Sequence, residues 1–542
     1  MSEYKKKLQE AVGISPANKI TTDTTKSFIE NTGVTINAKG RRVEKYYRLG
    51  ETIGEGSMGL IRLGTRRLEI GQSTFVGKLK GGVRTIAAAV SGEKSSVNHN
   101  MHLGEAKSSG EQVYAIKTII LSLVSADFVA EIKNEIEILQ SMDHPNIVKA
   151  YETFEDRRKT VSIVLEHCSG GDLYRRAPYT EYQAGDITSK LLSAIRFLHS
   201  KNISHRDLKF ENIMFENESE NAEIKLLDFG LSKKYKDNAP MREGVGTIYT
   251  MSPQVLQRVY TNKADIWASG VIAYMLLVDR MPFKAHSRKK MVERILKVDY
   301  SLEGKAWAEK SDKSKDFIRK LIVLDPHERY NAGQALDHPW FEEVRIMREK
   351  KNDLGDEVKR SVKRALSAYK SSCMMKKMAL FAVAQKSTVS EVEDMRKIFQ
   401  TYDVEQDGAI SLDEFRKAMK AFNYTEEEVI SVFRGLDIDN SGVIQYTEFL
   451  AGTLAATSKL GEKKLQESFQ TFDQNKTGYI TTKNLKHVLG KDFTEKLAAE
   501  LIQDFDTDGD GKISFEEFCV GMHRQTKKQM KNLEDKFDEI GI

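Results

Sequence analysis

The sequence predicts a two-lobed α+β domain followed by an all-α domain built from repeated helix–loop–helix units. Its 542 residues are enough for three or four folded units, at about 100 to 200 residues each. Near residue 50, a glycine-rich stretch with alternating apolar residues predicts a sheet at the start of the first domain. After Asp403, an acidic loop recurs every 33 to 36 residues, and this period indicates a tandem repeat of one helical unit.

The net charge of +5 is concentrated in one segment of the chain. Residues 342–386 contain 12 Lys or Arg and 6 Asp or Glu, so the remainder of the chain is close to neutral. Local basicity of this kind argues against a general nucleic-acid binder, and we expect no nucleic-acid partner.

Cysteine usage and the absence of targeting signals indicate a cytoplasmic protein. Cys168, Cys373 and Cys519 lie far apart without metal-ligand spacing, so neither disulfides nor a zinc site is expected. The sequence has no run of about 18 apolar residues and no signal-peptide core. Ser2 stands where N-myristoylation requires glycine. We therefore expect a monomer without a membrane anchor, which reaches a membrane only through a partner.

The first strands are expected to begin near residue 46. Residues 1–45 are polar and show no sustained periodicity, so they are predicted to be a flexible tail. Residues 49–61 alternate like two strands around Gly54, Gly56 and Gly59. Glycines at this spacing mark many ordinary hairpins, but without a Cβ they can also cover phosphate groups closely. The pattern by itself leaves both interpretations open.

A strand lysine, Lys117, follows an insertion at residues 67–110 that is rich in Gly, Ser and Lys. We expect the insertion to be a flexible surface loop rather than a docking element. Lys117 needs a carboxylate partner, and the helix-period segment 128–139 supplies three candidates. Among them, Glu135 stands at the position expected for the partner of the strand lysine, four residues before Leu139.

Four polar residues at fixed spacing carry the chemistry of the first domain. Asp207 is followed by Lys209 and Asn212, and Asp228 precedes a Phe-Gly pair. This set suits phosphoryl transfer, which depends mainly on positioning and charge neutralisation. Asp207 would accept the proton of a substrate hydroxyl and Lys209 would steady the transferred group, while Asn212 and Asp228 would hold Mg²⁺.

On these motifs, residues 46–341 resemble a eukaryotic serine/threonine protein kinase. The resemblance implies a bilobal fold with ATP in the cleft, in which Lys117 and Glu135 join Asp207 and Lys209 as catalytic residues. It also implies that ATP is surrounded by Ile53, Gly54, Glu55, Gly56, Ser57, Gly59, Ile61, Ala115, Lys117, Leu165, Glu166, Cys168, Asp172 and Met214.

The same resemblance suggests finer roles around the cleft. Leu165 would be the gatekeeper, and the backbones of Glu166 and Cys168 would contact the adenine. Asp172 and Glu211 lie where many kinases bind an arginine three residues before the phosphorylated Ser or Thr. We therefore expect protein substrates with an upstream arginine.

Two residues depart from the kinase pattern. Phe210 replaces a proline that only shapes the catalytic loop. Gln254 replaces a glutamate that normally pairs with a buried arginine, here Arg329. Removing one partner of a buried ion pair costs about 3 to 5 kcal/mol. Because the Gln254 carbonyl can still accept a hydrogen bond, we expect only part of that loss.

The activation segment lacks a phosphorylatable hydroxyl, since residues 233–246 contain neither Ser nor Thr. Glu243 is placed to supply a permanent negative charge to Arg206, which would make Ser/Thr phosphorylation of this segment unnecessary. The alternative is that Glu243 is an ordinary surface glutamate.

Three loops match the calcium-binding EF-hand pattern, with side-chain ligands at positions 1, 3, 5 and 12, glycine at 6 and a backbone carbonyl at 7. The predicted ligands are Asp403, Glu405, Asp407, Ala409 and Glu414 in the first loop, Asp437, Asp439, Ser441, Val443 and Glu448 in the second, and Asp506, Asp508, Asp510, Lys512 and Glu517 in the fourth.

The third loop, residues 473–484, departs from this pattern. It keeps one ligand carboxylate, Asp473, and has Asn484 at position 12. We interpret it as a pairing partner for the fourth hand that does not bind calcium tightly. Three functional hands are therefore expected, with dissociation constants of about 10⁻⁷ to 10⁻⁵ M.

Residues 342–392 form the predicted junction between the two domains. Within it, residues 357–386 combine basic and apolar residues at spacings of three or four, which is typical of a basic amphipathic helix. Such a helix suits an EF-hand groove. It could instead lie on an anionic membrane or be a solvated linker.

The order of kinase domain, junction and four EF-hands resembles the calcium-dependent protein kinases of plants and protists. The resemblance implies EF-hand pairs at residues 393–457 and 458–526, then a C-terminal tail at 527–542. It also implies a junction that blocks the substrate cleft at low calcium. Asp172 and Glu211 would then hold a basic residue from the cluster of Lys359, Arg360, Lys363 and Arg364.

The junction also contains a candidate modification site. Arg364 stands three residues before Ser367, and this spacing fits an autophosphorylation site, although it can arise by chance.

The leading interpretation is an ATP- and Mg²⁺-dependent kinase activated by calcium binding to its own EF-hands. One alternative is a kinase whose junction recruits separate calmodulin. The other is an inactive calcium-binding scaffold, suggested by Gln254 and Phe210. Lys117, Asp207 and Asp228 are all present, and this favours an active enzyme.

Overall fold

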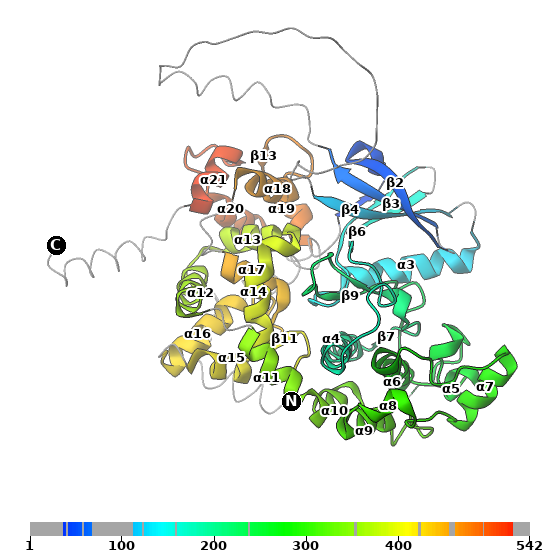
Figure 1. The fold of residues 1–542 in the computed structure, drawn as a ribbon. Coiled ribbons are helices and arrows are strands. Elements are labelled where there is room, and N and C mark those ends of the chain that lie inside the picture. Colours follow the sequence, from blue (N-terminus) through cyan, green and yellow to red (C-terminus); the bar gives the residue numbers. More distant parts are fainter. Residues whose placement is uncertain are drawn as a thin grey trace, which may run out of the picture.

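A two-lobed α+β domain and a helical sensor domain lie side by side in the computed structural model of this chain (Figure 1). The structure describes residues 36–39, 42–56, 59–67, 112–121, 124–157, 160–236, 239–351, 355–420, 424–454, 461–490 and 493–523. Most of the predicted N-terminal tail, the insertion apart from Arg67, and the predicted C-terminal tail lie outside these residues. Below, residues 389–523 are called the sensor domain and residues 342–386 the junction.

The small lobe is a six-stranded sheet in the order β1-β5-β6-β4-β3-β2, accompanied by helix α3. Its elements are β1 (Ile36–Lys39), η1 (Val43–Lys45), β2 (Tyr47–Gly56), β3 (Gly59–Arg66), β4 (Val113–Ile120), α3 (Ala126–Gln140), β5 (Ala150–Glu155) and β6 (Thr160–Glu166). The predicted hairpin is present, because β2 pairs antiparallel with β3. Ile116 and Ile119 of β4 are buried and anchor this central strand in the lobe.

The end of the predicted flexible tail is instead structured, so that prediction is wrong for residues 36–39 and 43–45. Strand β1 pairs in parallel with β5, in the register Ile36 to Glu152. An edge strand joins a sheet through backbone hydrogen bonds, which need no apolar side-chain pattern. The alternation of β1, Ile-Asn-Ala-Lys, is only four residues long, too short to mark a strand in the sequence.

The large lobe is mostly helical and is built around α6, which is buried along almost its whole length. Its elements are α4 (Glu181–Ser200), β7 (Ile203–Ser204), η3 (Phe210–Asn212), β8 (Ile213–Phe215), β9 (Ile224–Leu226), β10 (Lys233–Lys234), η4 (Ile248–Thr250), α5 (Pro253–Leu256), α6 (Lys263–Val278), α7 (Arg288–Lys297), α8 (Lys305–Ala308), α9 (Asp312–Leu321), α10 (Ala332–Leu336) and η5 (Pro339–Phe341).

The sensor domain consists of two pairs of helix–loop–helix units. The first pair contains α14 (Val389–Tyr402), β11 (Ala409–Ser411), α15 (Leu412–Met419), α16 (Glu426–Leu436), β12 (Val443–Gln445) and α17 (Tyr446–Leu454). The second contains α18 (Glu462–Phe472), β13 (Tyr479–Ile480), α19 (Thr482–Leu489), α20 (Glu495–Gln503), β14 (Ile513–Ser514) and α21 (Phe515–His523). Strands β11 and β12 pair within one unit pair, and β13 and β14 within the other. The predicted fold class, an α+β domain followed by a helical domain, is confirmed.

The junction forms α11 (Glu342–Lys351), α12 (Gly355–Lys370) and α13 (Met374–Lys386). The single amphipathic helix predicted for residues 357–386 is therefore wrong. Between α12 and α13, the hydroxyls of Ser371 and Ser372 donate to the carbonyls of Ser367 and Ala368, and such local bonds compete with the helical ladder.

The junction and the sensor share one hydrophobic core. Leu366 and Tyr369 of α12 and Met378 of α13 are fully buried among the EF-hand side chains. Helix α13 contacts α17 and α18, so it lies between the two EF-hand pairs, as Figure 1 shows. Its burial on all sides differs from the predicted amphipathic pattern. The predicted junction boundary at residue 392 falls inside α14.

Candidate active site and calcium-binding loops

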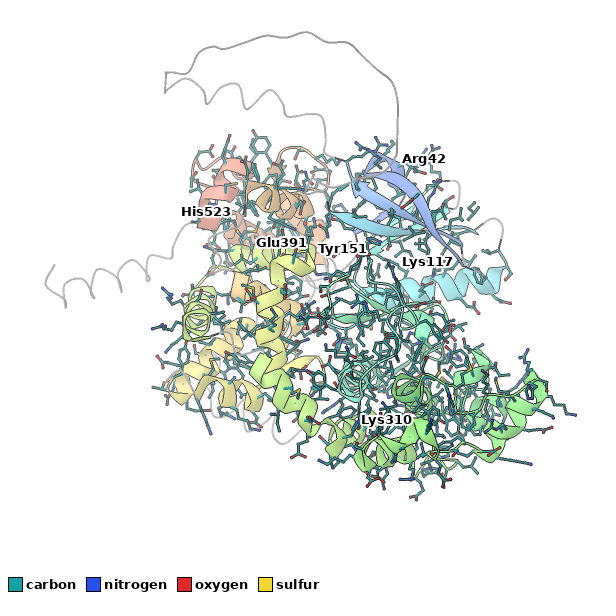
Figure 2. The ribbon with its side chains drawn as sticks, in the orientation of Figure 1. Arg42, Lys117, Tyr151, Lys310, Glu391 and His523 are labelled. Atoms are coloured by element: carbon teal, nitrogen blue, oxygen red, sulfur yellow. The ribbon has the colours of Figure 1, made fainter. Side chains whose placement is uncertain are left out.

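Lys117 lies on strand β4, and its side chain points from the sheet toward helix α3 (Figure 2). Its Nζ lies 2.6 Å from Glu135 Oε1 and 3.9 Å from Asp228 Oδ1. Burial raises the pKa of Glu135, and the Lys117 ammonium opposes that rise. Of the three candidate carboxylates, Glu135 is thus the one that pairs with Lys117.

The backbone of residues 204–206, directly before Asp207, is held by a buried carboxylate. Asp265 accepts hydrogen bonds from the backbone N–H groups of His205 (3.0 Å) and Arg206 (2.9 Å). It also accepts one from the Ser204 hydroxyl at 2.9 Å. Burial raises the pKa of Asp265, but the His199 imidazole and these donors outweigh burial and lower it. The backbone leading to Asp207 is therefore fixed by several bonds to one anion.

Asp207 is the centre of a group of short polar contacts. Its carboxylate lies 2.7 Å from Lys209 Nζ and accepts a 2.7 Å hydrogen bond from the Thr247 hydroxyl. Asn212 Nδ2 donates to the Asp207 carbonyl at 2.9 Å. The structure thus brings three of the predicted residues together and adds Thr247, which sequence reasoning missed.

Asn212 and Asp228 suit the predicted Mg²⁺ site by their chemistry, because amide and carboxylate oxygens are ligands that Mg²⁺ accepts. The amide nitrogen of Asn212 is used by Asp207, which leaves its carbonyl oxygen as the atom for a cation. Asp228 has φ +55, and its Oδ1 accepts a 3.3 Å bond from the Gly230 N–H. The next residue, Phe229, is fully buried against the His205 ring.

The residues predicted to surround ATP lie on neighbouring strands. Gly54 of β2 pairs with Ile61 of β3, and Ala115 of β4 pairs with Leu165 of β6. The remaining pairings are Lys117 with Ile61 and with Ile163, Glu55 with Leu60, Gly56 with Gly59, and Asp172 with Met214. Ile53 is largely exposed, Cys168 is buried, and Glu166 forms a 3.1 Å ion pair with Lys225. Ser57 lies outside the described residues.

Glu243 of the activation segment lies beside the arginine of the catalytic loop. Its Oε2 is 3.2 Å from Arg206 Nη1, and its other oxygen bonds Lys233. The hydrogen bond from Lys233 is the main cause that lowers the pKa of Glu243 to about 2. This geometry fits the predicted charge role for Glu243.

Gln254 occupies the position of the usual glutamate and contacts Arg329 as expected. Its Oε1 accepts a 3.0 Å bond from Arg329 Nη2, while its Nε2 donates to the Leu324 carbonyl at 2.7 Å. Arg329 is almost fully buried, and burial lowers its pKa to about 10. A neutral acceptor has therefore replaced the acid without breaking the contact.

Helices α12 and α13 of the junction lie on the sensor, whereas α11 packs against the large lobe. The acidic pair at the substrate cleft contacts its own lobe. Asp172 Oδ1 accepts from the backbone of Tyr174 at 3.0 Å, and Glu211 Oε2 accepts from the Tyr249 hydroxyl at 2.8 Å. On α12, the Lys363 ammonium lies 4.3 Å from the centre of the Tyr424 ring.

The four EF-hand loops share one internal bonding pattern. In each, the Gly at position 6 has φ between +78 and +86 and donates its N–H to the Asp at position 1. Each Glu at position 12 accepts backbone N–H groups of its own loop. Only a residue that tolerates positive φ permits this sharp turn.

Carboxylates converge in two of these loops, as a cation site requires. Oxygen atoms of Asp437, Asp439 and Glu448 lie within 4.8 Å of one another, as do those of Asp506, Asp508 and Asp510. Burial, and next the charge of Asp439, raise the pKa of Asp437 to about 7. Burial together with Asp407 and Glu414 likewise raises the pKa of Asp403 well above its usual range. The carboxylates in each loop repel one another, and a bound Ca²⁺ would offset this repulsion.

In the third loop, two side-chain amides form a hydrogen bond with each other. Asn484 Nδ2 donates to Asn475 Oδ1 at 2.7 Å, so positions 3 and 12 are joined directly. Its short strand β13 pairs with β14 of the fourth hand. The third loop therefore pairs with the fourth, as predicted. In the fourth loop, Lys512 places its ammonium 3.2 Å from Asp510 and would offer only its backbone carbonyl to a metal.

Comparison with known proteins gives the same two domains. The family model described as the protein kinase domain matches residues 91–341. The EF-hand domain pair matches twice, at residues 392–454 and 462–522. The fold and site thus define a protein kinase that carries paired EF-hands.

Full-length relatives refine this class. "Calcium-dependent protein kinase 7" of Arabidopsis thaliana is 33% identical over 434 residues, covering 78% of this chain and 79% of the relative. "Calcium-dependent protein kinase 32" of the same plant is 30% identical over 516 residues, covering 93% and 87%. "Calcium-dependent protein kinase 5" of Plasmodium falciparum (isolate 3D7) is 32% identical over 402 residues, covering 72% and 70%. The chain belongs to the calcium-dependent protein kinases, and the predicted enzyme class, a calcium-dependent serine/threonine protein kinase, is confirmed.

Within the described residues, no helix is both long and apolar enough to span a membrane.

Proposed function

We propose that this kinase transfers the ATP γ-phosphoryl group to Ser or Thr of proteins with Asp207 as the base. The observation that carries the proposal is the Asp207 group, in which Lys209 and Thr247 hold the carboxylate and Asp265 holds the backbone of the two preceding residues. Asp207 would take the substrate proton, and Lys209 would stabilise the transferring group.

Lys117, anchored by Glu135, would orient the ATP phosphates in the cleft. Asn212 and Asp228 would hold Mg²⁺, which neutralises charge on the phosphates when bound. The residues around ATP are proposed to be the predicted ones on β2, β3, β4 and β6 together with Ser57, Cys168, Asp172 and Met214, with Leu165 as gatekeeper.

The test uses the purified chain, ATP-Mg²⁺ and a peptide with arginine three residues before a serine. Activity is expected with calcium, little with a chelator, and a loss of at least about 10³-fold in Asp207→Asn. A peptide lacking the arginine tests the proposed roles of Asp172 and Glu211. Activity only after added calmodulin would favour the separate-sensor alternative, and inactivity throughout would favour the scaffold.

We further propose that three hands bind calcium and that the junction inhibits the kinase at low calcium. The acidic pair Asp172 and Glu211 and the basic cluster of α12 are complementary in charge, which supports such a contact. Reversing the charges of Arg360, Lys363 and Arg364 should raise activity in chelator. If activity in chelator stayed at the wild-type level, this contact would not be the inhibitory one.

A further inference from the structure

The calcium-binding loops of the first two hands contact the kinase domain directly, at the loop that joins α3 to β5. Thr447 donates to the Asp143 carboxylate twice, from its backbone N–H at 2.9 Å and from its hydroxyl at 2.7 Å. Gly408 packs against His144 so closely that a Cβ there would lie 2.3 Å from the imidazole. The second calcium loop thus contacts Asp143, and the first contacts the adjacent residue, His144.

These contacts involve the metal-binding parts of the loops. Thr447 immediately precedes Glu448, the predicted bidentate ligand of the second loop. Gly408 occupies position 6 of the first loop. In the same loop, Arg196 of α4 bonds the Glu405 carboxylate at 2.8 Å, and Glu405 is a predicted ligand. Any rearrangement of the ligands on calcium binding therefore acts on groups that touch the kinase domain.

The loop that receives these contacts, residues 141–148, is also hydrogen-bonded to α3 and β9, the elements that carry or precede Glu135 and Asp228, the two partners of Lys117. On one side, the Met142 N–H donates to the Leu139 carbonyl in the last turn of α3, the helix that carries Glu135. On the other side, the Leu226 N–H donates to the Asn146 carbonyl at 2.8 Å. Leu226 ends β9, two residues before Asp228.

His144 fixes the shape of this loop. Its Nδ1 accepts from the Asn146 N–H at 3.0 Å, so its Nε2 donates to the Ser193 hydroxyl on α4 at 3.0 Å. Because the ring is buried and both nitrogens are used, a displacement at Gly408 has to move the loop or break these bonds. The calcium loops are therefore linked through residues 141–148 to the last turn of α3 and the end of β9, the elements next to the Lys117 ion pair.

We propose that Asp143 and His144 are positioning residues that couple calcium in the first two hands to nucleotide in the cleft. The coupling acts through the placement of Glu135 and Asp228 around Lys117. It rests on the proposed function, because it requires that the hands bind calcium and the cleft binds ATP. Linkage then demands reciprocity, so a nucleotide that favours the assembled ion pair must also raise calcium affinity.

The experiment measures calcium binding rather than activity. Full-length chain is titrated with calcium by isothermal calorimetry at constant Mg²⁺, with and without a non-hydrolysable ATP analogue. In the wild-type chain, the analogue should raise calcium affinity by at least about fivefold, the lower end of typical coupling. In Asp143→Ala, this effect should fall below about twofold although both ligands still bind.

Two further variants keep the test decisive. Thr447→Val removes one of the two bonds to Asp143 at nearly constant shape and should give intermediate coupling, also if Asp143→Ala fails to fold. Thr401→Val makes the same substitution at an exposed sensor position and should keep wild-type coupling. Wild-type coupling in Asp143→Ala or in Thr447→Val would overturn the inference. Independent binding of the two ligands to the wild-type chain would also overturn it, whereas failure to bind calcium or nucleotide would contradict the proposed function.

Discussion

At the scale of single residues, two departures from the kinase pattern keep a contact while changing its chemistry. Glu243 places a carboxylate beside Arg206, where many kinases place a phosphate. Gln254 places an amide beside Arg329, where most place a carboxylate. Each exchange alters the charge facing an arginine, so each has a measurable consequence.

We predict that Glu243→Ala lowers kcat by up to about tenfold, because Arg206 and Lys233 lose their shared anion. The pKa of Glu243 is lowered to about 2, so its charge is present above about pH 5 and is lost only as the pH falls toward 2. A phosphate would titrate near pH 6. The activity ratio of variant to wild type should therefore be the same at pH 6 and pH 8. Glu218→Ala, at an exposed position in the same lobe, should leave kcat unchanged.

We predict that Gln254→Glu raises the thermal unfolding midpoint of the kinase domain. Burial lowers the pKa of Arg329 to about 10, and a carboxylate at 3.0 Å would compensate this cation better than an amide. Gln254→Ala should instead cost about 1 kcal/mol, since the buried Arg329 loses one acceptor and keeps the carbonyls of Val323 and Lys263. Differential scanning calorimetry of the full-length chain measures both. Equal midpoints for the wild type and Gln254→Glu would show that the lost bond to Leu324 offsets the new charge.

At the scale of elements, the third hand is a folded unit whose loop is closed by amides. Its turn glycine, its strand β13 and its helices match those of the other hands. Relative to the second loop, the lost carboxylates are those at Asn475 and Asn484, which bond each other at 2.7 Å. The third hand thus pairs with the fourth through β13 and β14 although its loop lacks carboxylates at positions 3 and 12.

We predict a calcium stoichiometry of three for the wild type, measured by calorimetry or native mass spectrometry. Glu448→Gln should reduce it to two, because a bidentate ligand is lost. The double variant Asn475→Asp with Asn484→Glu should raise it to four, because carboxylates then stand at positions 1, 3 and 12. A wild-type stoichiometry of four would mean that the amide loop binds calcium as it is.

The elements that could be predicted from sequence are those specified by local spacing. The glycine at position 6 of each EF-hand loop dictates the turn, and the Lys117–Glu135 pair follows from strand and helix register. Strand β1 could not be predicted, because it is held by backbone bonds to β5. The break between α12 and α13 depends on serine hydroxyls and on burial within the sensor. Asp143 and Thr447 are 304 residues apart, and neither has a local pattern that marks it as a contact.

At the scale of the whole molecule, the sensor is joined to the large lobe by a buried set of alternating charges. These come from α4, the β8–β9 turn, α11 and α14, and consist of the acids Asp186, Glu216 and Glu223 and the bases Lys190, Arg348 and Arg396. The set is balanced in charge only when the sensor is docked, because α14 belongs to the sensor. Docking therefore completes a network that the kinase domain and α11 together leave one cation short.

Arg396 is the residue through which this docking can be tested. Its guanidinium binds Glu216 with both nitrogens, at 2.6 and 3.0 Å, and both side chains are buried. A buried carboxylate left without its partner costs about 3 to 5 kcal/mol, so Arg396→Ala should undock the sensor in most molecules. Small-angle X-ray scattering in calcium should then give a larger radius of gyration.

Glu216→Ala combined with Arg396→Ala should recover part of the docking, because no unpaired charge is buried. Arg416→Ala is the matched control and should scatter like the wild type, because Arg416 is only partly buried and pairs with Asp413 and Glu426 inside the sensor. An unchanged scattering curve for Arg396→Ala would mean that the contacts at Asp143 and His144 hold the sensor in place without this network.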